Sequence, residues 1–372
     1  MTSEPAIHAP QKREYAGTDT TRRPWWRRAL RWETGLVVVL IATVIFGSAQ
    51  SSDFLNSTTG FYIGLNMGEI AIMALPLTLI VITGEIDLSV ASMLGLSGAV
   101  MGQLYSEGWP IALAMVAALV VGALGGALNG VLVARLGLPS IAVTIGTLTL
   151  FRGLAEIILG ARTITGFPTS LTDIGVVPVP GTQLSYSTVI FIVLAIIFGV
   201  VLHATGAGRA IVATGLAPEA AQFAGIRVKR IKFTLFVLSG VMCALAGILF
   251  TLKNASVSYD AGTGLELNVV AIVLFGGVSI FGGRGTIIGV VLSVIIFGTL
   301  LQVLTQMQVQ PEVQNIIIGG LLLVSVILPN GAEAVRRLRA RLRTGPHLAW
   351  GSRSQRPVSS SDSSLKTTEE KR

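Results

Sequence analysis

The sequence predicts an all-α, polytopic membrane protein with about ten transmembrane helices. Of its 372 residues, 52% are hydrophobic and 12% are charged, whereas about 25% of the residues in a typical soluble domain are charged. Apolar runs close to the length that a helix needs to cross a bilayer, about 20 residues, recur along the chain. The basic residues collect in the polar segments that flank or separate these runs. This combination is not that of a soluble domain.

The predicted spans follow one another closely, so their ends are approximate. They lie near residues 35–49, 61–83, 88–105, 110–134, 140–160, 187–205, 233–252, 267–281, 286–306 and 312–329. The first run ends in small residues at Ala49, which leaves a cleaved signal peptide as the alternative. The long leader before it favours a span.

Three regions follow from this pattern. Residues 1–34 are polar and basic and predict a cytoplasmic tail that ends in an interfacial anchor of tryptophans. Residues 35–330 form the transmembrane domain. Residues 331–372 are first basic and then Ser-rich, which predicts a membrane-surface anchor on anionic lipid followed by a disordered cytoplasmic tail.

The distribution of the basic residues predicts the orientation. With the N-terminus inside and ten spans, all but three of the 27 Lys and Arg lie inside or at the inner boundary; the exceptions are Arg152, Arg162 and Lys253. Cytoplasmic segments carry this excess in membrane proteins. The net charge of +8 therefore reflects membrane topology, and no nucleic-acid partner is expected.

The longest outside segment runs from Ala161 to Tyr186 and is rich in Gly, Pro and Thr. It shows little helical period, so we expect an irregular loop. An external partner or a gate would act there.

A polar cytoplasmic loop, residues 207–232, interrupts the apolar runs and carries helix signals. Pro218 and Glu219 suit a helix start, because proline lacks only an N–H that would be unsatisfied and a carboxylate meets the positive end of the helix dipole. Gly225 suits the helix end. Between them, Phe223 forms an aromatic knob within a stripe of alanines, which predicts a short helix that sits in a partner's groove.

Polar side chains within the spans are expensive and usually face a cavity, a partner or the boundary. Asp87 follows a break at Gly84 and precedes the third span, so it either caps that span or lines a pathway. Hydrogen bonding between helices is the alternative for the uncharged groups. The tentative pathway residues are Asn66, Glu69, Asp87, Ser89, Asn129 and Gln302.

Two glycine-rich stretches predict close helix packing or breaks. The first, Gly122 to Gly130, suits a helix-packing face. The second, Gly276 to Gly285, resembles the break at Gly84 because small residues and a charge separate two apolar runs. Paired breaks also occur at transport sites, although these two do not occupy equivalent positions in two halves of the chain.

Several chemistries have no support in the sequence. It contains no G-x-x-x-x-G-K-[ST] for nucleotide binding and no H-E-x-x-H or G-x-S-x-G for hydrolysis. The three histidines are scattered and the single cysteine, Cys243, lies in an apolar run. We therefore expect no catalytic residues, no metal site and no bound cofactor.

Four stretches resemble the permease subunits of bacterial ABC importers for sugars, the ribose, xylose, rhamnose and autoinducer-2 type. They are GRAIVATGLAPEAAQFAGIRVKRIK, TGEIDLSVAS, GLELNVVAIVLFGGVSIFGGRGTIIG and, more loosely, RLGLPSIAVTIGTLTLFRGLAEI. The likeness covers roughly residues 35–330. The family pattern is usually TGGIDLSVG, so Glu85 and Ala91 depart from it.

The resemblance implies a type II-like importer permease in a bacterial inner membrane, with both termini cytoplasmic. It also implies a second permease copy, as a homodimer or heterodimer, two ATPase subunits that bind ATP and Mg inside, and a sugar-binding protein outside. Residues 207–232 would be the coupling loop. The ATPase-coupling residues would be Pro218, Glu219, Ala220, Ala221, Phe223, Gly225 and Arg227.

Three alternatives stay open. The first is an ABC permease for branched-chain amino acids or nucleosides, which belong to a related group. The stretch IDLSVAS resembles the sugar permeases and favours them over that group. An ion-coupled secondary transporter would carry protons on Glu69, Asp87, Glu156 or Glu312 and would need no ATPase. A membrane scaffold or enzyme lacks supporting motifs.

Overall fold

The computed structural model of the chain describes residues 32–51, 54–325 and 327. A compact unit extends to Val326, and the second unit, Ile327–Arg372, lies almost wholly outside the described residues. The predicted leader, apart from residues 32–34, and the predicted C-terminal tail also lie outside them. All structural statements below concern the first unit.

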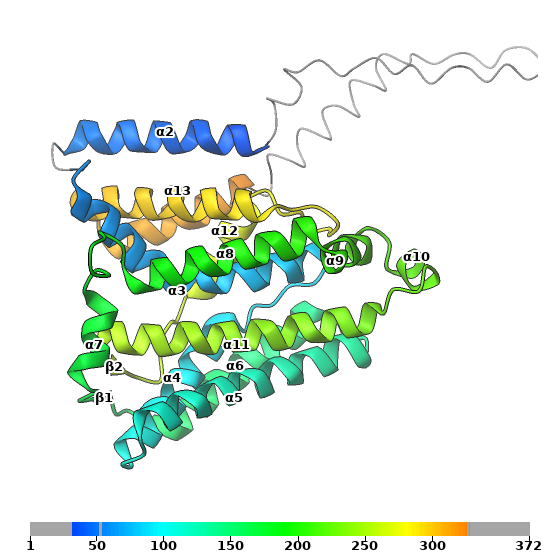
Figure 1. Ribbon diagram of the computed structural model, residues 1–372, viewed down its shortest axis with the longest axis horizontal. Helices are drawn as coiled ribbons and strands as arrows, with labels where there is room; N and C mark the ends of the chain where they lie inside the picture. The colour runs from blue at the N-terminus through cyan, green and yellow to red at the C-terminus, as the bar shows by residue number, and fades with distance from the viewer. Residues whose placement is uncertain (1–31, 52–53, 326, 328–372) are drawn as a thin grey trace, which may run out of the picture. The chain divides into compact units, whose positions relative to one another are not determined.

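The described chain consists almost entirely of helices (Figure 1). The elements are α2 Trp32–Gln50, α3 Ser57–Ile82, α4 Val90–Ser106, α5 Ile111–Gly130, a π-helical turn Val131–Arg135, α6 Ser140–Leu159, β1 Ile164–Thr165, α7 Thr169–Val176, α8 Tyr186–Ala204, α9 Gly206–Leu216, α10 Pro218–Phe223, α11 Val228–Asn254, β2 Ser256–Val257, α12 Leu265–Phe275 and α13 Ile287–Gln306. A further apolar helix, Pro311–Ser325, follows α13.

The predicted all-α, polytopic fold is confirmed. Seven described helices are long and apolar enough to cross a membrane. Three shorter ones, α4, α12 and Pro311–Ser325, overlap the remaining predicted spans. The first predicted span is helix α2, which packs along α13.

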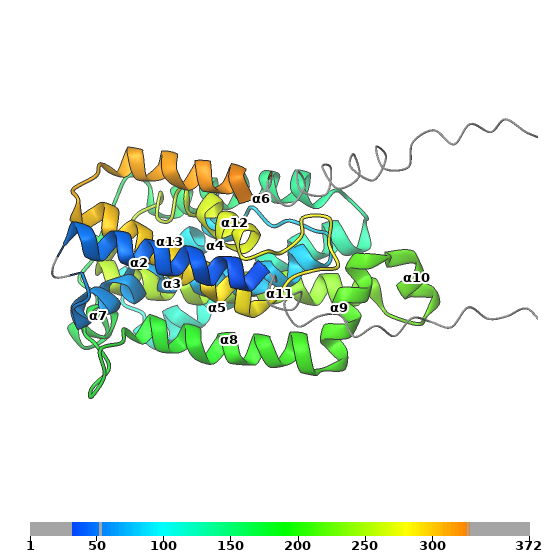
Figure 2. The ribbon, with the colours of Figure 1, turned by 90° about the horizontal axis from the view of Figure 1, so that it is seen from above.

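Helix α3 forms the centre of the unit. It is buried from Met67 to its end at Ile82 and packs against α8, α11, α12 and α13 (Figures 1 and 2). By contrast, α2, α5, α6 and α8 expose many large apolar side chains, as membrane-facing or partner-facing helices do because lipid does not penalise apolar surface.

Helices α5 and α11 touch through glycine backbones. A Cβ atom placed on Gly240 of α11 would lie 2.0 Å from the carbonyl oxygen of Gly122 in α5, and one on Gly126 would lie 2.3 Å from the carbonyl oxygen of Phe236. Such distances leave no room for any side chain. The glycine-rich stretch of α5 is therefore a helix-packing face, as its composition predicts.

Helix α10 lies at one end of the unit, and α7, β1 and β2 lie at the other (Figure 1). The segment 161–186 is more ordered than we expected. It contains α7, and its strand β1 pairs antiparallel with β2, which places Ile164 opposite Val257. The reason is tertiary packing: Gly175 of α7 lies so close to the backbone of Lys253 that a Cβ would come within 2.7 Å of it.

Candidate functional site

The predicted short helix is α10, and its boundaries match the sequence signals. Pro218 occupies the first turn with Glu219, and the helix ends at Phe223. Gly225 follows with φ of +82°, a conformation that favours glycine. The amide N–H of Ile226 then donates to the carbonyl oxygen of Ala221 and closes the turn.

Helix α10 presents a small apolar surface. The side chain of Phe223 is 92% exposed, and Ala220 and Ala224 lie beside it on the exposed surface. Pro218, Glu219, Gly225 and Arg227 are also exposed, whereas Ala221 is buried at the base of the helix. Ala221 therefore holds the helix in place and is not available to a partner.

A basic cleft of about 420 Å³ lies between the end of α10 and the start of α11. It is lined by Gln222 and residues 225–230, which include Arg227, Lys229 and Arg230. Phe223 follows the lining residue Gln222 directly in the chain, so the exposed ring lies at the end of the helix that borders this cationic cleft. We call α9, α10 and this cleft the coupling arm.

The coupling arm contains more helix than the sequence signals indicated. The segment before Pro218 forms α9, which begins with Thr205 as its cap: the Thr205 hydroxyl accepts from the Gly208 N–H at 3.3 Å. Lys229, Arg230 and Lys232, which we placed in the loop, lie in the first turns of α11. The first turn of α11 is basic, so the apolar run that predicts a span begins only after the helix has started.

A second cluster surrounds the break between α3 and α4. The Asp87 carboxylate accepts from the backbone N–H of Ser89 at 3.0 Å and from the hydroxyls of Ser89 at 2.6 Å and Ser239 at 3.1 Å. Asn129 of α5 donates to the Ser89 hydroxyl at 2.8 Å. The structure thus brings three of the six tentative pathway residues, Asp87, Ser89 and Asn129, into one buried network.

The same broken segment is tied to α6 and α11. The Ile86 N–H donates to the Ser140 hydroxyl at 3.1 Å, and the Ile86 carbonyl accepts from the Thr144 hydroxyl at 3.3 Å. Glu85, which departs from the family pattern, forms an ion pair with Lys232 at the start of α11. Unwound backbone at membrane depth must be covered by protein in this way, because lipid offers it no hydrogen bonds.

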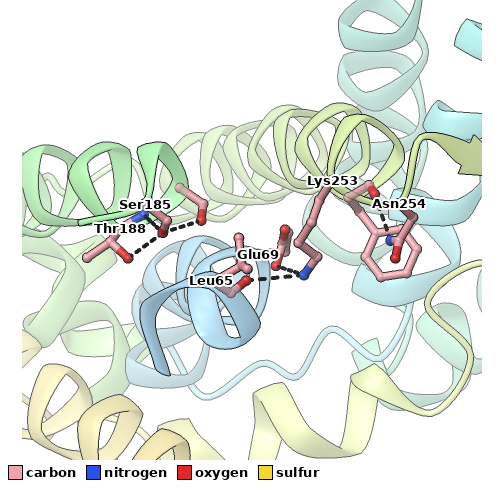
Figure 3. Close-up of polar contacts among 8 residues, drawn as sticks. Leu65, Glu69, Ser185, Thr188, Lys253 and Asn254 are labelled. Atoms are coloured by element: carbon pink, nitrogen blue, oxygen red, sulfur yellow. Dashed lines mark hydrogen bonds and ion pairs between the residues drawn. The ribbon is translucent and has the colours of Figure 1, made fainter. Parts of the chain in front are cut away.

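Glu69 lies far from this cluster and pairs with Lys253 (Figure 3). The Lys253 amine lies 2.8 Å from the Glu69 carboxylate and 3.2 Å from the carbonyl oxygen of Leu65. Glu69 is 2% exposed, and its second carboxylate oxygen, Oε1, has no hydrogen-bond partner among the described residues. The pair neutralises a carboxylate in the middle of α3.

The remaining two tentative residues stand apart from both clusters. Asn66 is exposed on α3, and Gln302 is half-buried on α13. The residues that sequence reasoning missed are the partners: Ser239, Lys232 and Lys253. No local signal identifies them, because each contacts a residue more than 100 positions away.

The comparison with protein families agrees with this architecture. The family model described as "Branched-chain amino acid transport system / permease component" matches residues 61–326. This range includes the break at Gly84, the coupling arm and the glycine-rich loop between α12 and α13. The chain belongs to this permease family. The prediction of an importer-type permease subunit, made from the resemblance, is confirmed at this level.

Curated relatives of the chain are also permease proteins of import systems. The chain is 32% identical over 312 residues to the autoinducer 2 import system permease protein LsrC of Salmonella choleraesuis, an alignment that covers 84% of this chain and 87% of that protein. It is also 32% identical over 302 residues to the LsrD permease protein of Escherichia coli strain K12, with coverage of 80% and 91%. No solved structure matches the chain.

Proposed function

We propose that this permease is the membrane subunit of an ABC importer for a sugar or a sugar-like solute. A separate ATPase grips the coupling arm from the cytoplasm and supplies the energy. A soluble binding protein delivers the solute to the opposite side. The second permease copy completes the translocation path.

The single observation that carries the ATPase assignment is the exposed Phe223 on α10. An aromatic side chain that is 92% exposed, on a helix of six residues next to a cleft lined by Arg227, Lys229 and Arg230, has no partner within the described chain that would account for it. Buried aromatic anchors commonly dominate the energetics of protein interfaces. A partner with an apolar pocket and an acidic border would satisfy both the ring and the cations.

The orientation is supported by the distribution of charge in the described chain. The arm end carries Arg209, Arg227, Lys229, Arg230 and Lys232, and Arg135 lies at the same end with its guanidinium 5.3 Å from the ring of Phe233. The end with β1 and β2 carries Arg162 and Lys253. An excess of cations marks the cytoplasmic side of membrane proteins, so the arm faces the cytoplasm, where an ATPase would be.

The substrate class is supported by the relatives, whose printed names describe autoinducer 2 import. The pairing of charges agrees with a neutral solute: Glu69 is matched by Lys253, and Glu85 by Lys232. A neutral polyol needs hydroxyls and amides along its path, and the side-chain amides of Asn66 and Gln302 are candidates. The family description names branched-chain amino acids, which makes them the second candidate substrate class.

Transport in proteoliposomes tests the proposal. The permease is reconstituted with its ATPase and its binding protein, and uptake of D-ribose, D-xylose, L-rhamnose and L-leucine is compared. We expect ATP-dependent uptake of one of the sugars and none of leucine. Leucine uptake would assign the chain to the second class. Uptake that an uncoupler abolishes, and that depends on neither ATP nor the binding protein, would identify the chain as a secondary transporter.

A further inference from the structure

We propose that Gly215 and Lys232 are positioning residues that join the coupling arm to two breaks in the membrane domain, so that these parts move as one body. This inference rests on the proposed function, because it assigns a route to the motion that the ATPase supplies. We call the contact among the end of α3, the end of α9 and the loop between α12 and α13 the glycine junction. It is centred on Ile82, Gly84, Gly215, Gly282 and Gly283.

The first link in the glycine junction is between α9 and α3. A Cβ atom on Gly215 would lie 1.8 Å from the carbonyl oxygen of Ile82 and 2.5 Å from the backbone nitrogen of Gly283. No side chain separates the arm from the end of α3, so backbone rests directly on backbone. Close-packed contacts of this kind transmit displacement, because there is no soft side chain to absorb it.

The second link joins the two breaks to each other. The Gly283 N–H donates to the Ile82 carbonyl oxygen at 2.8 Å. A Cβ atom on Gly282 would lie 2.9 Å from the Gly215 carbonyl oxygen and 3.1 Å from the Gly84 nitrogen. Gly84, Gly282 and Gly283 all have positive φ, between +72° and +82°. The backbone is therefore shaped at these positions to bring three segments together.

The third link is the ion pair between Lys232 and Glu85. Lys232 lies in the first turns of α11, directly after the basic cleft, and Glu85 lies in the broken segment next to Gly84. Both side chains are mostly buried, with exposed fractions of 17% and 16%. The arm is thus attached to the break from two directions, through α9 at Gly215 and through α11 at Lys232.

Beyond the glycine junction, each break leads to a different part of the membrane domain. The segment after Gly84 carries Ile86, Asp87 and Ser89. Ile86 is hydrogen-bonded to α6, Asp87 to α11 and to Ser89 at the start of α4, and Ser89 to Asn129 of α5. The loop containing Gly282 and Gly283 connects α12 to α13. A displacement of α10 would therefore reach the start of α4 and the start of α13 together.

Substitution at Gly215 tests the first link in the complete transporter, the permease with its ATPase and binding protein in proteoliposomes. Gly215→Ala forces α9 away from Ile82. We expect the number of sugar molecules transported per ATP hydrolysed to fall about tenfold while the ATPase remains bound. A tenfold change lies within the typical range of energetic coupling between two sites. The matched control is Gly206→Ala in the same helix, whose new Cβ would meet only the Arg209 guanidinium, at 3.6 Å.

Charge reversal tests the third link. Glu85→Lys and Lys232→Glu each place like charges together, and we expect each to lower sugar transport per ATP. The double variant restores the attraction and should restore most of the ratio. The ratio is measured on folded, ATPase-bound complexes, so a loss of stability alone does not change it.

Normal transport per ATP in Gly215→Ala, or single reversals that lower only abundance, would overturn the glycine junction as a coupling route. The same data separate this failure from failure of the proposed function. If the ATPase does not bind the wild-type chain, the proposed function is wrong. If it binds and drives uptake but Gly215→Ala behaves as Gly206→Ala does, only the junction is wrong.

Discussion

The Lys253 amine lies 2.8 Å from the Glu69 carboxylate and so ties the last turn of α11 to the middle of α3 (Figure 3). The same amine also donates to the Leu65 carbonyl oxygen. The position of Lys253 near the end of an apolar run suggests a free charge at the membrane surface. The structure instead pairs its amine with Glu69 and Leu65. Lys253 is therefore part of the packing of the central helix.

Breaking the Lys253–Glu69 pair should destabilise the protein. Lys253→Met leaves the buried Glu69 carboxylate without its cation, and removing one partner of a buried pair typically costs about 3 to 5 kcal/mol. We expect a lower thermal unfolding midpoint in detergent. The double variant Lys253→Met with Glu69→Leu should recover part of the loss, because no charge is then buried. Equal midpoints for wild type and Lys253→Met would show that the pair contributes nothing.

Removing the aromatic ring from the coupling arm should weaken ATPase binding. Phe223→Ala deletes the exposed ring without touching the packing of α10, since Phe223 is 92% exposed. Truncation of an interface anchor typically costs about 2 kcal/mol or more, so we expect ATPase affinity to fall about 30-fold or more. This affinity is measured from the binding of the ATPase to permease that is held in nanodiscs on a sensor surface. The control is Leu55→Ala, a 72% exposed apolar side chain in the connection between α2 and α3. Unchanged affinity in Phe223→Ala would exclude the ring as the anchor.

A side chain at Gly240 should separate α5 from α11. The Cβ of Gly240→Ala would lie 2.0 Å from the Gly122 carbonyl oxygen, which is backbone and cannot move aside cheaply. Overpacking of this kind typically costs about 1 to 3 kcal/mol. We expect lower abundance and a lower unfolding midpoint. Gly146→Ala on α6 is the matched control, because nothing lies within 4 Å of its Cβ. An unfolding midpoint equal to that of this control would contradict the observed contact.

The sequence predicted the helices well because they follow from apolar length, which no distant contact alters. It also predicted α10, because Pro218, Glu219 and Gly225 act through local backbone chemistry. It did not predict α7, whose order comes from the packing of Gly175 on Lys253. Nor could it predict which residues pair: Lys232 with Glu85 and Lys253 with Glu69 are separated by 147 and 184 positions.

The role of Asp87 was open between a helix cap and a pathway residue, and one substitution distinguishes them. The carboxylate accepts three hydrogen bonds and is 3% exposed. In Asp87→Asn, the amide oxygen can keep the bonds from Ser89, but the NH₂ group can no longer accept from Ser239 as the second carboxylate oxygen does. A lost buried hydrogen bond typically costs about 1 to 3 kcal/mol.

If Asp87 only holds the start of α4, Asp87→Asn should lower the unfolding midpoint and leave sugar uptake per folded transporter unchanged. This is the outcome that the geometry favours, because all of the hydrogen bonds described for the carboxylate come from this chain's own Ser89 and Ser239. The control is Ser239→Ala, which removes the same contact from the α11 side and should shift the midpoint by a similar amount. A reduced uptake per folded transporter in Asp87→Asn, with normal uptake in Ser239→Ala, would instead place the Asp87 carboxylate on the substrate path.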